Sequence, residues 1–222
     1  MANLESIGAD KANFTTALDP RVPCVVICDT SASMSGEPIQ ELNDGLKALY
    51  DDLSLDRQAS RVVDLAVVTF GGDVLVAQEF RTVEMSFVPT LKAEGCTPMG
   101  EAVNTALDLM EIQKQHYNEA GVPRRRGWIF LISDGAPTDE WLQAAARAIS
   151  YQDSQSVLFF SIGVQGADLA MLGRFSQQPV YSLDGLRFVE LFKWLSKSMK
   201  AASRRANLGP GNLPSTKDWS KE

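Results

Sequence analysis

The sequence predicts an α/β fold with a doubly wound, mostly parallel central sheet, one antiparallel edge strand and helices on both faces. Strand-like and helix-like segments alternate along the 222 residues, which is typical of this class. Several strand-like segments, such as 23–28, are continuous apolar runs, as expected for strands covered on both faces. One segment, 74–80, instead alternates in polarity directly after Gly71-Gly72, which predicts a hairpin partner at one edge.

The first half of the chain contains a buried strand at 23–28, a helix at 38–53, a second strand at 61–70 and its hairpin partner at 74–80. The helix begins with Glu37-Pro38, and both residues suit a first helical turn. Proline has no N–H group that would lack a partner there, and the glutamate charge interacts favourably with the positive end of the helix dipole. Its apolar residues recur at helical spacing and form one stripe: Ile39, Leu42, Leu46, Leu49 and Leu53.

The second half continues the alternation. A short helix and loop are expected at 81–95, followed by a long helix at 98–116. The remaining elements, in order, are a strand at 128–132, a helix at 139–151, a strand at 157–164, a short helix at 167–175, a brief strand at 180–182 and a last helix at 186–200.

Composition limits the classes of partner. A formal net charge of −7 argues against a protein that binds nucleic acid or anionic membranes. No apolar stretch approaches the roughly 20 residues that a membrane-spanning helix needs. The first twenty residues have neither the basic start nor the apolar centre of a signal peptide, so a cytoplasmic location is expected.

The chain divides into three parts by composition. We expect an N-terminal extension at 1–20, one domain at 21–203 and a flexible polar C-terminal tail at 204–222, rich in glycine and proline, that is mobile or packs as an extended arm. Trp219 is unusual in such a tail. It could anchor in a groove of this protein or of a neighbour, and the sequence leaves both alternatives open.

The three cysteines do not predict a disulfide framework. Cys24 and Cys28 lie four residues apart on one strand, so their Cα atoms would be about 13 Å apart at about 3.3 Å per residue, too far for a disulfide. We expect both to be small buried apolar residues. Cys96 neighbours Thr97 and could be a reactive thiol, but the sequence shows no residue that would activate it. With His116 as the only histidine, a zinc site built from several histidines is excluded.

Oxygen ligands occur in three loops that the predicted topology brings together. Asp29, Ser31 and Ser33 form a D-x-S-x-S motif after the first strand, Thr97 precedes the helix at 98–116, and Asp134 follows the strand at 128–132. In open α/β sheets, ligands bind beyond the carboxyl ends of the strands at a topological switch point. Hard oxygen donors suit Mg²⁺ or Mn²⁺ better than zinc or copper. The sequence therefore predicts a metal site made by these five residues.

Each of these residues also has an ordinary structural alternative. The two serines and Asp29 could be turn or cap residues. Thr97 before Pro98 is a good N-cap for the helix that follows, and its hydroxyl cannot fully serve a helix cap and a metal at once. Asp139 is expected to cap the helix at 139–151 and is left out of the site.

Together, these motifs resemble the von Willebrand factor A (vWA) domain with its metal-ion-dependent adhesion site (MIDAS), over about 21–200. The resemblance implies that Ser31, Ser33 and Thr97 bind the metal directly. It implies that Asp29 and Asp134 act mainly through bound waters and supply negative charge. An acidic side chain of a partner protein would then complete the coordination, which is binding chemistry and not catalysis.

Within this family, the runs S-G-E-P-I at 35–39 and D-G-A-P-T-D at 134–139 resemble the stand-alone bacterial tellurium-resistance group (TerY-like, YegL-like). That resemblance implies a non-catalytic scaffold in a tellurite-resistance or stress phosphosignalling system, whose partner is a protein kinase or phosphatase presenting Asp or Glu. Two residues depart from the pattern. Ala32 occupies a position where members of the family commonly have glycine. Cys96 interrupts the run of glycines that usually precedes the threonine, so its side chain reduces the space in the loop before Thr97.

Two other functions are considered. Some members of the family are accessory subunits of AAA+ ATPases, and this role is the alternative to the phosphosignalling scaffold. A metal-dependent phosphohydrolase with Asp29 as the nucleophile is disfavoured, because the sequence has no D-x-D after the first strand and no Gly-rich P-loop.

Overall fold

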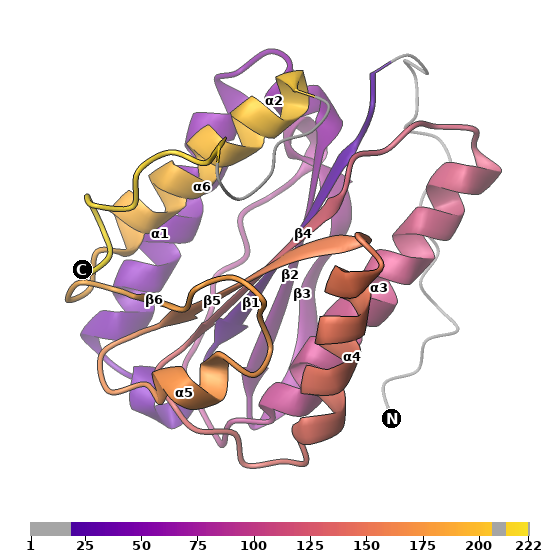
Figure 1. Ribbon diagram of the computed structural model, residues 1–222. Coiled ribbons are helices and arrows are strands. Elements are labelled where there is room, and N and C mark those ends of the chain that lie inside the picture. Colours follow the sequence, from indigo (N-terminus) through magenta and orange to yellow (C-terminus); the bar gives the residue numbers. More distant parts are fainter. Residues whose placement is uncertain (1–18, 206–211, 222) are drawn as a thin grey trace.

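The computed structural model describes residues 19–205 and 212–221. In this part of the chain a six-stranded sheet has the order β3-β2-β1-β4-β5-β6 (Figure 1). The strands are β1 (Val22–Asp29), β2 (Val63–Gly71), β3 (Asp73–Thr82), β4 (Gly127–Ser133), β5 (Val157–Gly163) and β6 (Tyr181–Ser182). All neighbours are parallel except β2 and β3, which form an antiparallel hairpin at one edge. The predicted fold class is confirmed.

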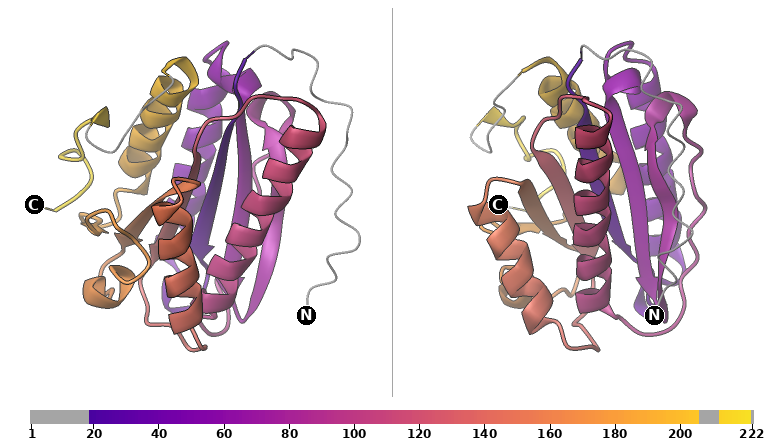
Figure 2. Two further views of the ribbon diagram at one scale, coloured as in Figure 1. Left: turned by 45° about the vertical axis from the view of Figure 1, so that its right-hand side comes forward. Right: turned by 90° about the vertical axis from the view of Figure 1, so that its right-hand side faces the viewer.

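Helices cover both faces of the sheet (Figure 2). They are α1 (Glu37–Ser54), α2 (Ala59–Val62), α3 (Met99–Glu119), α4 (Leu142–Asp153), α5 (Leu169–Leu172) and α6 (Phe188–Arg204), with 3₁₀ turns at η2 (Ala32–Met34) and η3 (Val83–Met85). The apolar faces of α1 and α6 pack on one side of the sheet, and those of α3 and α4 pack on the other. Among the described residues, no helix is both long and apolar enough to cross a bilayer.

The position of β1 in the centre of the sheet explains why its sequence is an uninterrupted apolar run. Cys24 and Cys28 point into the core beneath α1 and α6, whereas Val25 and Ile27 point into the core beneath α3. Because side chains alternate between the two faces of a strand, a sheet covered on both sides needs an apolar residue at every position. Both cysteines are fully buried and free, as predicted, and burial raises the pKa of Cys28 to about 12.

Several predicted boundaries shift by a few residues, and two of these shifts have a clear physical cause. Arg61 and Val62 belong to α2 and not to the second strand, because the carboxylate of Asp56 accepts hydrogen bonds from the amides of Gln58 and Ala59 and begins a helical turn there. The helix predicted at 139–151 begins only at Leu142. The residues before it are held by hydrogen bonds to α3 and to the loop before α3, as described below.

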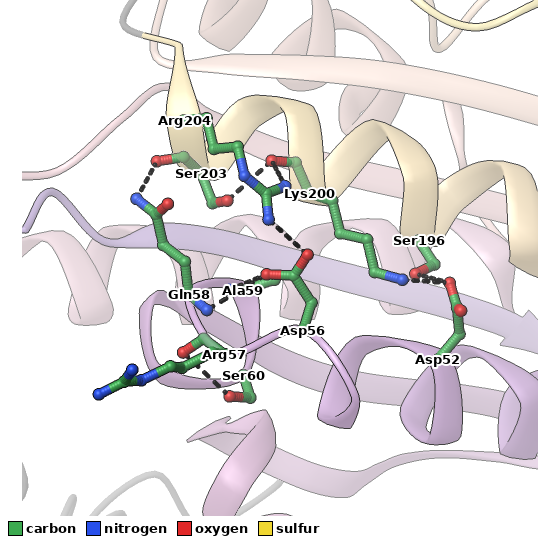
Figure 3. Close-up of polar contacts among 10 residues, drawn as sticks. All are labelled: Asp52, Asp56, Arg57, Gln58, Ala59, Ser60, Ser196, Lys200, Ser203 and Arg204. Atoms are coloured by element: carbon green, nitrogen blue, oxygen red, sulfur yellow. Dashed lines mark hydrogen bonds and ion pairs between the residues drawn. The ribbon is translucent and has the colours of Figure 1, made fainter.

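Polar side chains join α1 and α6 along their exposed border (Figure 3). Asp52 accepts hydrogen bonds from Lys200 Nζ at 2.7 Å and from Ser196 Oγ at 2.5 Å. Beyond the end of α1, Asp56 accepts one from Arg204 at 2.5 Å. These contacts fix the position of α6 along α1.

The close approach of α1 and α6 depends on Gly45. A Cβ atom at Gly45 would lie 2.6 Å from the ring of Phe192 and 2.9 Å from the backbone carbonyl of Phe188. Such distances are shorter than real Cβ contacts, so only glycine allows the two helices to pack this closely.

The tail residues 212–221 pack against this protein's own sheet edge and α6. Trp219 is 1% exposed, and its ring centroid lies 5.4 Å from that of Tyr181 and 5.2 Å from that of Trp194. An antiparallel bridge joins Ser220 to Leu183, just beyond β6. The groove that holds Trp219 is therefore part of the same chain. The predicted extension at 1–20 falls mostly on residues 1–18, which lie outside the described residues, and the domain bounds stay predictions.

Candidate metal centre

The topology brings the first and third predicted loops side by side. The chain leaves β1 toward β2 on one side and later enters β4 on the other, so the switch point lies between β1 and β4. These strands pair in parallel, with Cys28 opposite Ile132. Asp29 is the last residue of β1, and Asp134 directly follows β4. Both carboxylates therefore lie at the same edge of the sheet.

A short series of hydrogen bonds connects these two loops. The hydroxyls of Ser31 and Ser33 lie 3.0 Å apart, and Ser33 Oγ donates to Asp134 Oδ1 at 2.8 Å. Asp29 Oδ1 accepts from the amide of Ser31 at 2.9 Å, and its Oδ2 accepts from Ser133 Oγ at 2.5 Å. Four of the five predicted site residues are thus joined, and Ser133, which the sequence reasoning missed, connects to Asp29.

Thr97 reaches the same place from the second loop. A Cβ atom at Gly135 would lie 3.6 Å from Thr97 Oγ1 and 4.0 Å from Asp29 Oδ2. The threonine hydroxyl and the Asp29 carboxylate therefore face the same glycine, and Thr97 is only 7% exposed. The structure brings all five predicted residues together.

The loop before Thr97 is held between the D-x-S-x-S loop and the hairpin turn. The amide of Ala32 donates to the carbonyl of Gly95 at 3.0 Å, and the amide of Gly72 donates to the carbonyl of Cys96 at 2.9 Å. Gly95 has a φ of +71°, and a Cβ atom there would lie 2.4 Å from the Cα atom of Gly72. Two glycines in contact let this loop pass so close to the hairpin that it can deliver Thr97 to the site.

The two departures from the family pattern fit this geometry. Ala32 is not among the residues with positive φ, so its place in the motif does not require glycine. Cys96 is exposed and takes part in the loop through its backbone carbonyl, so its side chain does not displace Thr97.

The role predicted for Asp139 is wrong. Its carboxylate does not cap the helix that follows it. Instead, Oδ1 and Oδ2 accept hydrogen bonds from the amides of Gly100 and Glu101, in the first turn of α3. The neighbouring Thr138 pairs with Thr97 through two further hydrogen bonds of 3.1 and 2.9 Å. Sequence spacing pointed to the nearer helix, but the fold places the third loop against the second.

The cluster contains two carboxylates close together, Asp29 and Asp134. Burial raises the pKa of Asp29, the hydrogen bonds from Ser133 and Ser31 lower it in part, and the nearby charge of Asp134 raises it further, with a net rise. Among the described residues, none of the hydrogen bonds to these two carboxylates comes from lysine or arginine. A bound cation would offset both the burial and the mutual repulsion of the carboxylates.

The donor set fits Mg²⁺ or Mn²⁺. It consists of hydroxyl and carboxylate oxygens, and in the described residues no group of three or more His, Cys, Asp or Glu side chains forms an alternative metal site. The 3.0 Å between Ser31 Oγ and Ser33 Oγ matches neighbouring ligands of an octahedral ion, which lie about 3 Å apart for bonds of about 2.1 Å. Hydroxyl ligands and carboxylates that act through water are compatible with a small, strongly hydrated cation.

Solved structures show the same fold. The von Willebrand factor domain of the type V pili tip protein Mfa5 from Porphyromonas gingivalis aligns with a TM-score of 0.62 at 11% identity, covering 87% of this chain and 99% of that one. The pilus adhesin SpaC from Lactobacillus rhamnosus GG gives a TM-score of 0.64 at 12% identity, covering 83% of this chain and 31% of that one. At these identities the likeness extends to the fold alone.

A third structure carries a metal. Proximal thread matrix protein 1 from the mussel byssus, in a form with a zinc-occupied MIDAS motif, aligns with a TM-score of 0.53 at 15% identity. The alignment covers 81% of this chain and 48% of that one, so this chain spans about half the length of the mussel protein.

No curated protein matches the sequence. A family model does, over residues 24–190, which include all of the sheet except the first two residues of β1, and all five predicted site residues. By this match the chain belongs to the von Willebrand factor type A domain family.

Proposed function

We propose that this protein is a non-catalytic, metal-dependent protein-binding scaffold that uses a MIDAS to bind an acidic side chain of a partner. The observation that carries the proposal is the meeting of three hydroxyls and two carboxylates at the switch point of the sheet, where no lysine or arginine of the described residues bonds to the carboxylates. A bound cation would balance the charge of the two carboxylates, and Mg²⁺ or Mn²⁺ suits the oxygen donors.

The five residues would have two different roles at the metal. Ser31, Ser33 and Thr97 would hold the metal directly through their hydroxyls. Asp29 and Asp134 accept hydrogen bonds from Ser133 and Ser33, so they would contact the metal through bound water and supply negative charge from behind the direct ligands. When bound, the metal supplies an electrophilic position that a carboxylate of the partner can occupy.

Binding without catalysis is supported by what surrounds the site. The only histidine of the sequence, His116, lies in the last turn of α3, at the far end of that helix from Thr97. Among the described residues, the hydrogen bonds within the cluster join hydroxyls, carboxylates and backbone groups, and no nucleophile is paired with a general base.

For the biological setting, we propose a bacterial tellurite-resistance or stress phosphosignalling system in the cytoplasm, with a protein kinase or phosphatase as the partner. The support is the likeness of residues 35–39 and 134–139 to the stand-alone bacterial group. The three free cysteines, two of them buried, agree with a reducing compartment.

The test is a pull-down from the native cytoplasm with tagged wild-type protein, in Mg²⁺ and in EDTA, beside Asp29→Ala. Asp153→Ala is the matched control, because this exposed carboxylate ends α4 at the opposite edge of the sheet. We expect a partner that is retained by wild type and Asp153→Ala in Mg²⁺, and lost in EDTA and in Asp29→Ala. The same set of retained proteins in all four conditions would contradict the adhesion-site mechanism.

A further inference from the structure

Thr97 could serve either the metal or α3, and the structure shows which role its surroundings leave open. By sequence, Thr97-Pro98 should begin the helix, with the threonine hydroxyl as the cap. In the structure α3 begins at Met99, after Pro98. The amide of Met99 donates to the backbone carbonyl of Thr97, and the next two amides donate to Asp139. The hydroxyl of Thr97 is therefore not the acceptor for these amides.

Asp139 takes over this capping role. The first amides of a helix have no partners within it, and a carboxylate is well suited to accept from them because it also favours the positive end of the helix dipole. Asp139 accepts from Gly100 N at 3.0 Å and from Glu101 N at 2.8 Å. The cap thus comes from a residue 38 or 39 positions away, in the loop that carries Asp134.

The packing around Gly100 shows that this contact is built into the fold. A Cβ atom at Gly100 would lie 2.7 Å from the Cα atom of Trp141, 2.9 Å from the carbonyl of Glu140 and 3.1 Å from Asp139 Oδ2. Only glycine lets the first turn of α3 approach the 139–141 backbone this closely. The position of Asp139 against the helix is therefore fixed by backbone contact as well as by hydrogen bonds.

Thr138 holds the backbone of Thr97 at the same time. Thr97 N donates to Thr138 Oγ1 at 3.1 Å, and Thr138 N donates to the carbonyl of Thr97 at 2.9 Å. The backbone of Thr97 is thus held from the third loop, while its hydroxyl lies beside Gly135, which the Asp29 carboxylate also approaches.

We propose that Asp139 is a positioning residue for the metal site, an inference that rests on the proposed function. By capping α3 from the third loop, Asp139 keeps Thr97 outside the helix and leaves its hydroxyl available to the metal. Without Asp139, the uncapped amides draw Thr97 into the N-cap position, where its hydroxyl accepts from Gly100 N and is withdrawn from the site.

The experiment compares wild type, Asp139→Ala, Thr97→Val, the double variant and Glu140→Gln, all as the full chain. Mn²⁺ affinity is measured by titration of wild type, Asp139→Ala and Glu140→Gln. Glu140→Gln is the matched control, because it removes the neighbouring negative charge without removing a cap. We expect Asp139→Ala to weaken Mn²⁺ binding by about fivefold, in line with the free energy of a typical helix cap, and Glu140→Gln to stay within about twofold of wild type.

A second readout does not need the metal. Amide hydrogen exchange at Gly100 is measured in EDTA for the two single variants and the double variant. We expect Gly100 to stay protected in Asp139→Ala, because Thr97 caps it, and to exchange at least about tenfold faster in the double variant. If Asp139→Ala does not fold, Asp139→Asn replaces it in both measurements, with smaller expected differences, since one acceptor oxygen remains.

The outcomes separate this inference from the proposed function. Mn²⁺ binding that is equal in wild type and Asp139→Ala would overturn the role of Asp139 and leave the metal site intact. Equal exchange of Gly100 in Asp139→Ala and the double variant would also overturn it, because Thr97 would then not replace the cap. A wild type that does not bind Mn²⁺ would instead overturn the proposed function, and with it the metal role of Asp139.

Discussion

Ser33 Oγ donates a 2.8 Å hydrogen bond to Asp134 Oδ1, and this contact joins two loops that are 101 residues apart in the sequence. It closes the D-x-S-x-S loop onto the loop after β4. The carboxylate of Asp134 is half-buried and close enough to Asp29 to raise the pKa of that residue. The structure thus keeps two carboxylates near each other, which costs stability unless a cation binds between the loops.

Asp134→Ala should separate stability from metal binding. In EDTA, we expect its free energy of unfolding to lie within about 1 kcal/mol of wild type, because one lost hydrogen bond is offset by less repulsion at Asp29. Wild type should gain about 2.7 kcal/mol from Mg²⁺ at 100 times the dissociation constant, and the variant should gain little. Urea denaturation in EDTA and in Mg²⁺ measures both quantities. An equal gain from Mg²⁺ in the two proteins would show that Asp134 does not serve the metal.

Gly95→Ala should damage the second loop. Its φ of +71° and the 2.4 Å approach of a Cβ atom to Gly72 combine backbone strain with a clash against backbone atoms. We expect a loss of more than about 1 kcal/mol in the free energy of unfolding, together with weaker Mn²⁺ binding, since the loop positions Thr97.

Gly121→Ala is the matched control for this variant. It has a similar φ of +65°, but nothing lies within 4 Å of its added Cβ. It should show only the cost of the backbone conformation, about 1 kcal/mol, and normal Mn²⁺ binding. Equal losses in the two variants would mean that the contact with Gly72 is unimportant.

The sequence predicted the fold, and it placed the five candidate site residues in loops that the structure brings together, because strands and strand ends are marked by local patterns. Buried strands are apolar runs, and the position of Asp29 at the end of one follows directly from where that run stops. In a mostly parallel sheet the carboxyl ends of the strands lie at one edge, so the loops after β1 and β4 are expected there, but the direct pairing of these two strands is known from the structure.

What the sequence could not predict are contacts between loops. Asp139 was assigned to the helix beside it in sequence, because spacing gives no indication that α3 lies nearer in space. Ser133 was missed for a related reason: it is the last residue of a buried strand, and only the pairing of β4 with β1 shows that its hydroxyl reaches Asp29. The D-G-A-P-T-D run did indicate that this loop is unusual, but not what it contacts.

Acid should weaken the contact between α1 and α6. Burial acts to raise the pKa of Asp52, but hydrogen bonds from Lys200 and Ser196 outweigh burial and lower it. For Asp56, burial is likewise outweighed by the Ala59 amide and Arg204, and its pKa is also lowered. A carboxylate with a lowered pKa in the folded state stabilises the fold above its unfolded pKa of about 3.9, and this contribution is lost as the pH falls through the folded value.

The prediction is therefore a smaller loss of stability between about pH 5 and pH 2 in the Asp52→Asn/Asp56→Asn double variant than in wild type. Urea midpoints measured across this range test it. Asp51→Asn is the control, because its side chain is 60% exposed and pairs with the exposed Lys47 on the same helix, not with α6. If the urea midpoint falls equally with pH in wild type and the double variant, the loss of stability in acid comes from groups other than Asp52 and Asp56.

Trp219 should contribute more to stability than its position in a polar tail suggests. It is buried between Tyr181 and Trp194, and its carbonyl accepts a 2.8 Å hydrogen bond from Asp184 N, so residues 212–221 cover the edge of the sheet next to β6. Removing a buried tryptophan ring typically costs about 3–5 kcal/mol, and the same loss is expected for Trp219→Ala in urea denaturation. Trp219→Phe keeps an aromatic ring in the groove and should lose less than half of this amount. A loss below about 1 kcal/mol in Trp219→Ala would mean that the tail adds little to the fold in solution. A large loss would show that residues 212–221 are part of the folded domain, because an exposed edge strand and an empty aromatic groove are both unfavourable.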